Sequence, residues 1–252
     1  MTDLRGITAV VTGAAQGIGA QLARGLADSA ANVVVADVID GAEVAAEINA
    51  SRGGNAFAAV ADVTDDASLE AMLAQAEATF GGVDVLVNNA ALFGKLEAAP
   101  FEELDYDEWD RVMRVNVRGV MQCAKAVVPR MTARGGGSII NISTNRIYKG
   151  FPGLLHYDAS KGAVAAMTKS MAKELGDRNI RVNAIAPGLT MSENVLAKEG
   201  IAERNEAVVD ARALRRSQEP EDLVGAVRFF ASPQSSFISG QTLIVDGGGI
   251  VL

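Results

Sequence analysis

The sequence predicts an α/β fold: one doubly wound, mainly parallel sheet of seven strands with helices on both faces. Short β-branched runs alternate with longer, Ala-rich stretches of helical period along the chain. The runs are almost continuously apolar, which is typical of strands buried on both faces of a parallel sheet. Alternation of this kind favours right-handed crossovers, which place helices on both sides of the sheet.

The expected elements follow one another in order. Strands are expected at residues 8–12, 32–37, 56–60, 83–88, 138–143, 181–186 and 243–246. Helices are expected at residues 17–28, 42–51, 67–80, 107–131, 157–176 and 221–231. Within 67–80, for example, Leu69, Met72 and Leu73 recur at helical spacing and predict one buried face.

Residues 190–216 do not fit this alternation. The stretch is polar and mildly helical, and it is inserted just before the last helix–strand pair. Because open α/β sheets bind ligands beyond the carboxyl ends of their strands, the insertion is predicted to be a substrate lid. A surface helical hairpin without a role in binding is the alternative.

Length and composition restrict both the domain organisation and the partners. The 252 residues, 49% hydrophobic and 21% charged, suit a single domain spanning 1–252 and exclude disorder. A net charge of −8 disfavours nucleic acid and membrane surfaces as partners. No apolar run reaches the roughly 18 residues of a membrane span. A start without signal-peptide character and one cysteine, Cys123, favour a cytoplasmic protein. No metal site is expected.

A glycine-rich turn links the first strand to the first helix. Glycines there allow a tight turn and close approach of a pyrophosphate to the free amides of the helix. Such a turn alone is weak evidence, but acids end the next two strands, and Asp37 lies where a carboxylate binds ribose hydroxyls. The expected dinucleotide-binding residues here are Gly13, Gln16, Gly17, Ile18, Gly19, Asp37, Asp62 and Val63.

Asp37 also indicates which dinucleotide is bound. Its carboxylate would repel a 2′-phosphate, and neither Val38 nor Ile39 supplies a compensating positive charge. Gln16 in the turn is neutral as well. The expected cofactor is therefore NAD and not NADP. A simple turn acid at the strand end is the alternative interpretation of Asp37.

Tyr157 and Lys161 lie four residues apart, so they share one face of a predicted helix. The phenol has an ordinary pKa of about 10, and a nearby ammonium is expected to lower that pKa. The pair can then take a proton from an alcohol or give one to a carbonyl. This spacing is common by itself and gains its meaning from the motifs around it.

Together, these motifs resemble the short-chain dehydrogenase/reductase family, whose members have a Rossmann fold. The resemblance covers essentially the whole chain and adds Asn88-Asn89-Ala90, Asn116, Pro187-Gly188 and the 239–248 ending to the motifs above. It implies an NAD(P)-linked oxidoreductase in which Tyr157 is the acid/base and Lys161 holds the ribose and lowers the Tyr157 pKa. It also implies that Asn116 anchors a water relay, and that the chain forms a homotetramer. Further cofactor contacts implied by the family are Asn89, Ala90, Tyr157, Lys161, Pro187, Gly188, Thr190 and Ser192.

Two positions depart from the family pattern. The usual catalytic Ser, 13 residues before the Tyr, is Thr144 here, and Ser143 precedes it. Adjacent side chains on a strand end point to opposite faces, so only one of the two reaches the site. We expect Thr144 to be the fourth catalytic residue beside Asn116, Tyr157 and Lys161, with Ser143 as the alternative. The second departure is Ala91, where Gly is usual.

The loops around Tyr157 suggest a moderately hydrophobic pocket. Arg146 is the charged exception, and three roles stay open for it: binding a substrate anion, facing solvent, or pairing with an acid across a subunit interface. His156, the only histidine, is expected to be a local hydrogen-bonding residue and not a catalyst. The expected substrate-binding residues are Phe93, Thr144, Arg146, Tyr148, Leu154, Tyr157 and Met191.

The sequence therefore predicts an NAD-dependent enzyme that interconverts a secondary alcohol, of aromatic or alicyclic type, and its carbonyl. Enoyl reduction is disfavoured, because that reaction usually goes with a wider Tyr-to-Lys spacing in the family. A catalytically weak NAD-binding sensor or scaffold is the alternative, supported only by Thr144 and Ala91.

Overall fold

The computed structural model describes residues 3–51, 55–94 and 96–251 and contains one seven-stranded, all-parallel sheet in these ranges. The strand order is β3-β2-β1-β4-β5-β6-β7, which confirms the expected doubly wound Rossmann topology. The strands are β1 (Thr8–Thr12), β2 (Asn32–Asp37), β3 (Ala56–Val60), β4 (Val85–Asn88), β5 (Gly137–Ile142), β6 (Ile180–Pro187) and β7 (Thr242–Val245).

The strand order reverses at β1, and this reversal positions the site. β1 pairs with β2 on one side, with Thr8 opposite Asn32, and with β4 on the other, with Ala9 opposite Val85. The connections after β1 and β4 therefore leave the sheet in opposite directions and open a crevice at its carboxyl edge.

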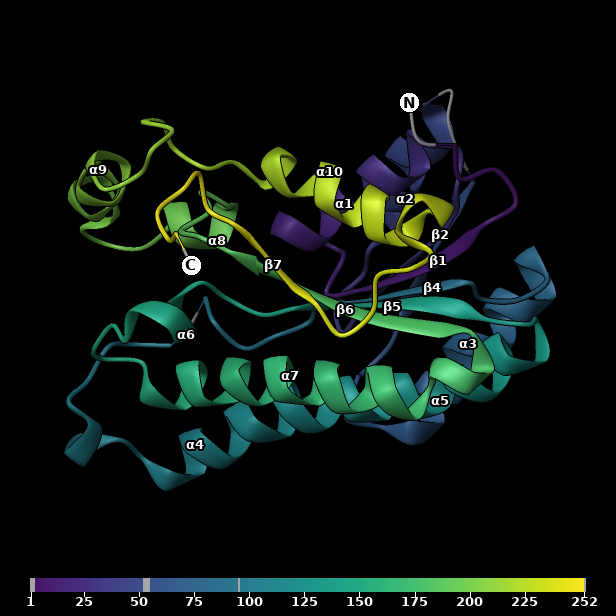
Figure 1. The fold of residues 1–252 in the computed structure, drawn as a ribbon, viewed down its shortest axis with the longest axis horizontal. Coiled ribbons are helices and arrows are strands. Elements are labelled where there is room, and N and C mark those ends of the chain that lie inside the picture. Colours follow the sequence, from purple (N-terminus) through teal and green to yellow (C-terminus); the bar gives the residue numbers. More distant parts are fainter. Residues whose placement is uncertain (1–2, 52–54, 95, 252) are drawn as a thin grey trace.

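Helices cover both faces of the sheet (Figure 1). Above it in that view lie α1 (Gly17–Ala27), α2 (Ala42–Ala50) and α10 (Val224–Ala231); below it lie α3 (Asp66–Phe80), α5 (Gly119–Ala133) and α7 (Leu155–Glu174). Each layer closes its own apolar core against the sheet. The lower core contains Cys123, which is buried, and burial raises the pKa of its thiol to about 12. None of the helices in the described ranges combines the length and apolarity needed to cross a bilayer.

The single helix expected at 107–131 consists of three parts. α4 (Tyr106–Met113) continues into a π-helical turn, Arg114–Arg118, and then into α5. A π turn inserts one extra residue into the helical ladder, which periodicity in the sequence does not reveal, and such turns are frequent at functional sites. Asn116 lies in this turn and is fully buried.

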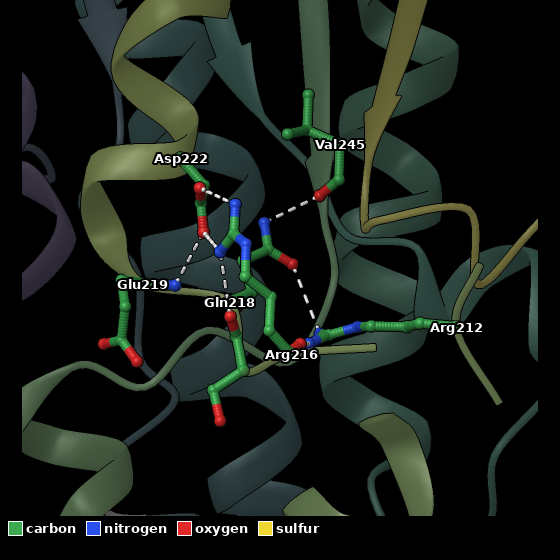
Figure 2. A network of polar contacts seen from close by, with 7 residues as sticks. Arg212, Arg216, Gln218, Glu219, Asp222 and Val245 are labelled. Atoms are coloured by element: carbon green, nitrogen blue, oxygen red, sulfur yellow. Dashed lines mark hydrogen bonds and ion pairs between the residues drawn. The ribbon is translucent and has the colours of Figure 1, made fainter. Parts of the chain in front are cut away.

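The 190–216 segment contains two short helices, α8 (Glu193–Leu196) and α9 (Ile201–Asp210). A polar network holds its far end to the sheet (Figure 2). The buried Arg212 guanidinium donates hydrogen bonds to the Leu189 carbonyl (2.8 Å) and to Gln218 Oε1 (3.3 Å), and Gln218 Nε2 donates to the Val245 carbonyl (2.8 Å). Arg216 adds a two-pronged ion pair with Asp222. The segment is thus anchored at its carboxyl-terminal end, and α8 and α9 lie outside this network.

We expect Arg212→Ala to loosen this end of the segment without unfolding the sheet. The variant loses hydrogen bonds from a charged donor, worth about 1.5–3 kcal/mol. The amides of Met191 and Leu214 donate to the carbonyls of Gln218 and Gly247 and report on the segment. Their hydrogen exchange should accelerate about ten-fold or more. Arg215→Ala, on the exposed neighbouring residue, is the matched control. Unchanged exchange in Arg212→Ala would show that the network does not hold the segment.

Candidate active site

The glycine-rich turn after β1 is packed too closely for side chains. Gly13 and Gly17 have positive φ values of 65° and 58°, which glycine adopts without strain. A Cβ at Gly13 would lie 2.8 Å from the Ala90 Cα, and one at Gly19 would collide with the Gly13 carbonyl oxygen. The turn therefore keeps its shape only with glycine at these positions.

Asn89 fastens this turn to the end of β4. Its Nδ2 donates to the carbonyl oxygens of Thr12 and Gly13, both at 2.9 Å. The Thr12 hydroxyl in turn accepts from the backbone amides of Asn89 and Ala90, each at 3.1 Å. Asn89 and Ala90 thus shape the crevice where the strand order reverses, and are more than ordinary turn residues.

The turn fits a dinucleotide. No capping hydrogen bond from the Gln16 side chain reaches the α1 N-terminus, so the first amides of that helix are available to a pyrophosphate. The Asp37 carboxylate lies beside the turn and accepts a hydrogen bond from the Ala15 amide at 3.0 Å. Gly41 also packs close to Ala15. Asp62 accepts from the amide and hydroxyl of Thr64, so its side chain also shapes its own loop.

Lys161 lies beneath the end of β5. Its Nζ donates to the carbonyl oxygen of Ile142 at 2.7 Å and lies 5.9 Å from the centroid of the Tyr157 ring. The side chain is almost wholly buried, and burial disfavours the charged ammonium. Desolvation accordingly lowers the Lys161 pKa to about 8.

Tyr157 lies in the first turns of α7 and is buried. Its ring packs on Phe93, with ring centroids 4.8 Å apart. Burial raises the pKa of its hydroxyl, and the Asp158 carboxylate adds to that rise; the Arg146 charge and a hydrogen bond from Thr144 oppose it. The expectation that Lys161 lowers the Tyr157 pKa does not hold here. The desolvation of the buried phenol outweighs the attraction between the phenolate and the ammonium. The hydroxyl is therefore neutral in the protein without cofactor.

The structure separates Thr144 from Ser143. The Ser143 hydroxyl donates to the backbone carbonyl of Lys161 at 3.1 Å, on the α7 side of β5. Both residues line the cavity described below. The Thr144 hydroxyl accepts from the Arg146 amide at 3.3 Å and lowers the pKa of Tyr157, so it lies on the tyrosine side. The geometry favours Thr144 as the partner of the tyrosine.

Asn116 meets the start of α7. Its Nδ2 donates to Ser160 Oγ at 3.1 Å and to the Leu92 carbonyl at 3.2 Å, while its Oδ1 accepts from the Leu92 amide at 2.7 Å. Ser160 then donates to the backbone carbonyl of Tyr157 at 2.7 Å. The π turn thus joins the loop after β4 to the helix turn that carries Tyr157.

A cavity of about 370 Å³ lies against Tyr157. Of the seven expected substrate residues, Phe93, Thr144, Arg146 and Tyr157 line it. The other three are not among its lining residues: Tyr148 is exposed, Leu154 packs in the small core behind the tyrosine, and Met191 is tied by its amide to Gln218. Among the expected cofactor residues, those lining the cavity are Ile18, Tyr157, Pro187, Gly188, Thr190 and Ser192.

The part of this cavity that α9 and the residue after it form was not predicted from the sequence. Arg204, Ala207, Val208 and Ala211 line it, on one face of the predicted lid. Their spacing of three, one and three residues is that of a single helical face, so a periodicity search within 190–216 would have found them. Lys149 and Phe151 were not predicted, because Lys149 ends a single-turn helix and Phe151 follows it, and one turn is too short to show a periodic pattern.

Arg146 faces an acid of its own chain. Its Nε and Nη2 bind the two oxygens of Asp158 at 2.7 and 2.9 Å. The pair is buried and ties α6 (Arg146–Lys149) to the start of α7. Of the roles left open by the sequence, solvent exposure is thereby excluded, and the acid that pairs with Arg146 belongs to the same chain.

Comparisons with known proteins identify the family. A family model described as Enoyl-(Acyl carrier protein) reductase matches residues 13–249. The chain is also 38% identical over 252 residues to Short chain dehydrogenase/reductase astE of Aspergillus oryzae, an alignment that covers 98% of this chain and 95% of the relative. The chain belongs to the short-chain dehydrogenase/reductase family.

Two further members of the family have names or bound molecules that indicate an activity and a cofactor. Cis-4-hydroxycyclohexanecarboxylate dehydrogenase of Sinomonas cyclohexanicum is 40% identical over 241 residues, covering 95% of both chains. A putative NAD(P) dependent gluconate 5-dehydrogenase from Beutenbergia cavernae was solved with NADP bound at low occupancy; it has a TM-score of 0.90 and 37% identity, and covers 98% of both chains. This chain is accordingly an oxidoreductase of the family that binds a nicotinamide cofactor.

The buried ammonium predicts a pH dependence of stability. The Lys161 pKa is about 8 in the folded protein and 10.5 ordinarily, so the unfolded chain binds more protons between these values and stability rises with pH there. From about pH 7 to about pH 9, we expect the free energy of unfolding of the cofactor-free protein to rise about 1 kcal/mol more than that of Lys161→Met. Urea denaturation measures this, with Tyr157→Phe in both proteins to remove the phenol titration. Equal slopes would contradict a desolvated ammonium.

Proposed function

We propose that this family member is an NAD-dependent dehydrogenase/reductase that interconverts a secondary alcohol and its ketone, in the cytoplasm. The observation that carries the proposal is that Tyr157 and Thr144 both line one largely apolar cavity. The same cavity reaches Ile18 beside the glycine-rich turn, so a cofactor held there would have its reactive ring near the pair. An aldehyde and a primary alcohol would use the same residues.

Each residue has a separate task in this mechanism. The Thr144 hydroxyl orients the substrate oxygen, and Tyr157 takes the alcohol proton or returns it to the carbonyl. The bound nicotinamide ring supplies the hydride acceptor or donor. Lys161 would hold the ribose of the bound cofactor, and its ammonium would then favour the phenolate form of Tyr157. Asn116, joined through Ser160 to the backbone of Tyr157, positions the water that carries the proton to solvent.

Three finer parts of the proposal rest on individual observations. Asp37, hydrogen-bonded to the Ala15 amide, supports NAD because its carboxylate is already at the turn that a 2′-phosphate would approach. A relative named for a hydroxycyclohexane substrate supports a ring-borne alcohol. The exposed Met121 on α5 supports a homotetramer in which α5 and α7 pack across subunits. We also propose that residues 190–216 act as the substrate lid of a single-domain enzyme.

Two alternatives remain as outcomes of the test. A catalytically weak NAD-binding protein would bind the cofactor and turn nothing over. Enoyl reduction is the activity in the description of the matching family model, and a panel that includes an enoyl thioester would detect it. The four-residue separation of Tyr157 and Lys161 favours carbonyl chemistry over both.

Turnover is expected to depend on the Tyr157 hydroxyl. Wild-type protein with NAD and a panel of cyclic and aromatic secondary alcohols should form NADH, measured by absorbance, and Tyr157→Phe should lower kcat by about 10²–10⁴-fold. Thr144→Ser should keep activity, and Thr144→Ala should lose about 10²-fold. Tyr106→Phe, an exposed tyrosine, is the control. Activity that survives Tyr157→Phe would refute this mechanism.

Cofactor choice is expected to depend on Asp37. Asp37→Asn removes the negative charge, so the ratio of kcat/KM with NADP to that with NAD should rise by about ten-fold or more. Asp40→Asn, an exposed acid on the same loop, controls for overall charge. A wild-type protein that already prefers NADP, or an unchanged ratio in Asp37→Asn, would overturn the assignment of NAD.

A further inference from the structure

The cavity beside Tyr157 has a cationic side. Arg146 and Lys149 of α6 and Arg204 of α9 line it, and no Asp or Glu is among the lining residues that the structure describes. The chain as a whole is acidic, with a net charge of −8. A cationic cavity in an acidic protein is therefore a local feature of the site and not a reflection of overall composition.

These positive charges are not all neutralised by the protein. Arg146 is bound on two prongs by Asp158. Within residues 3–51, 55–94 and 96–251, Arg204 has no ion pair or side-chain hydrogen bond. Lys149 Nζ lies 5.8 Å from the Phe151 centroid and beside Gly249, close to the Asp246 carboxylate. Arg204 is exposed as a whole; desolvation of its inner part and the neighbouring Arg146 charge lower its pKa, while the Asp158 carboxylate raises it. An anion beside Arg204 would remove this unfavourable electrostatic environment.

The cavity combines three kinds of lining. Tyr157 and Thr144 bring hydroxyl-bearing side chains from α7 and from the end of β5, and Arg204 brings a cationic side chain from α9. Apolar side chains are supplied by Phe93, Leu189, Val195, Ala207, Val208 and Ala211, beside the polar Ser143, Asn145, Thr190 and Ser192. A complementary molecule combines an alcohol, an apolar part and an anion.

Building on the proposed function, we infer that the substrate is a hydroxy acid, or its oxo acid in reverse, whose carboxylate is bound by Arg204 with Lys149 as a second cation. The planar guanidinium matches a carboxylate in two-pronged geometry. During oxidation the carbinol carbon loses its hydride to the nicotinamide, the hydroxyl proton goes to Tyr157, and the carboxylate stays unchanged. Because Arg204 lies on α9, binding of the acid would also hold α9 over the cavity.

Binding of non-reacting acids tests this inference without relying on turnover. Calorimetry of the protein saturated with NADH would compare three carboxylates, cyclohexanecarboxylate, benzoate and hexanoate, with their carboxamides. We expect at least one carboxylate to bind about ten-fold more tightly than its amide, and Arg204→Gln to remove that preference. Arg204→Lys should keep part of it. Arg215→Gln, an exposed arginine of the same segment that does not line the cavity, should leave it unchanged.

Each result has a distinct meaning. No carboxylate preference for any pair, or a preference that survives Arg204→Gln while NADH affinity stays constant, overturns the inference. If cyclohexyl phosphate binds more tightly than cyclohexanecarboxylate, the site prefers a phosphate ester, and the inference of a carboxylate substrate is also overturned. If neutral alcohols are oxidised equally by the wild type and Arg204→Gln, the proposed function stands without the acid. If the preference is present but neither the panel alcohols nor hydroxycyclohexanecarboxylates are oxidised, the anion site stands and the proposed alcohol–ketone interconversion fails.

Discussion

The burial of the Lys161 ammonium against one backbone carbonyl is the constraint on which the site depends. The hydrogen bond to Ile142 fixes the start of α7 at the end of β5, and the Ser143 hydroxyl returns a bond to the Lys161 backbone. With Ser143 held in this way, Thr144 is the hydroxyl that acts on Tyr157. Burial raises the Tyr157 pKa and lowers that of Lys161, so without a cofactor the phenol keeps its proton.

The site joins a rigid part to a movable one. Buried polar side chains link the sheet to α7, from Asn88 to Asn141 (2.9 Å) and from Asn141 to Thr168 (2.9 Å). Buried hydrogen bonds of this kind hold elements in one arrangement. By contrast, α9 contributes no fully buried residue; it is held by the network around Arg212 and by the hydrogen bond from Asn205 Nδ2 to Ser217 Oγ at 2.7 Å. In the proposed function, the chemistry thus lies on the rigid side, and substrate selection lies on the side with fewer buried contacts.

The sequence predicted most of the fold and part of the site. Strand boundaries were found to within a residue or two, because parallel strands are continuously apolar and the glycine-rich turn marks the first crossover. Of the expected catalytic residues, Thr144, Tyr157 and Lys161 could be placed because they lie just past a strand end or on a regular helix, whereas Asn116 was placed only by the resemblance to the family. The π turn at Asn116, the α9 face of the cavity and the pairing of Arg146 with Asp158 were not predicted. These depend on contacts between segments distant in sequence, which periodicity does not encode.

The single cysteine has a practical consequence for studying α9. Cys123 lies in the core between α5 and the sheet, and its raised pKa leaves almost no thiolate at neutral pH. Toward maleimides and other thiol reagents the folded chain therefore behaves as a cysteine-free protein. A cysteine introduced on the outer, solvent-facing side of α9 would be its sole labelling site. A fluorophore or spin label there would report the position of the helix without first rebuilding the protein on a cysteine-less background.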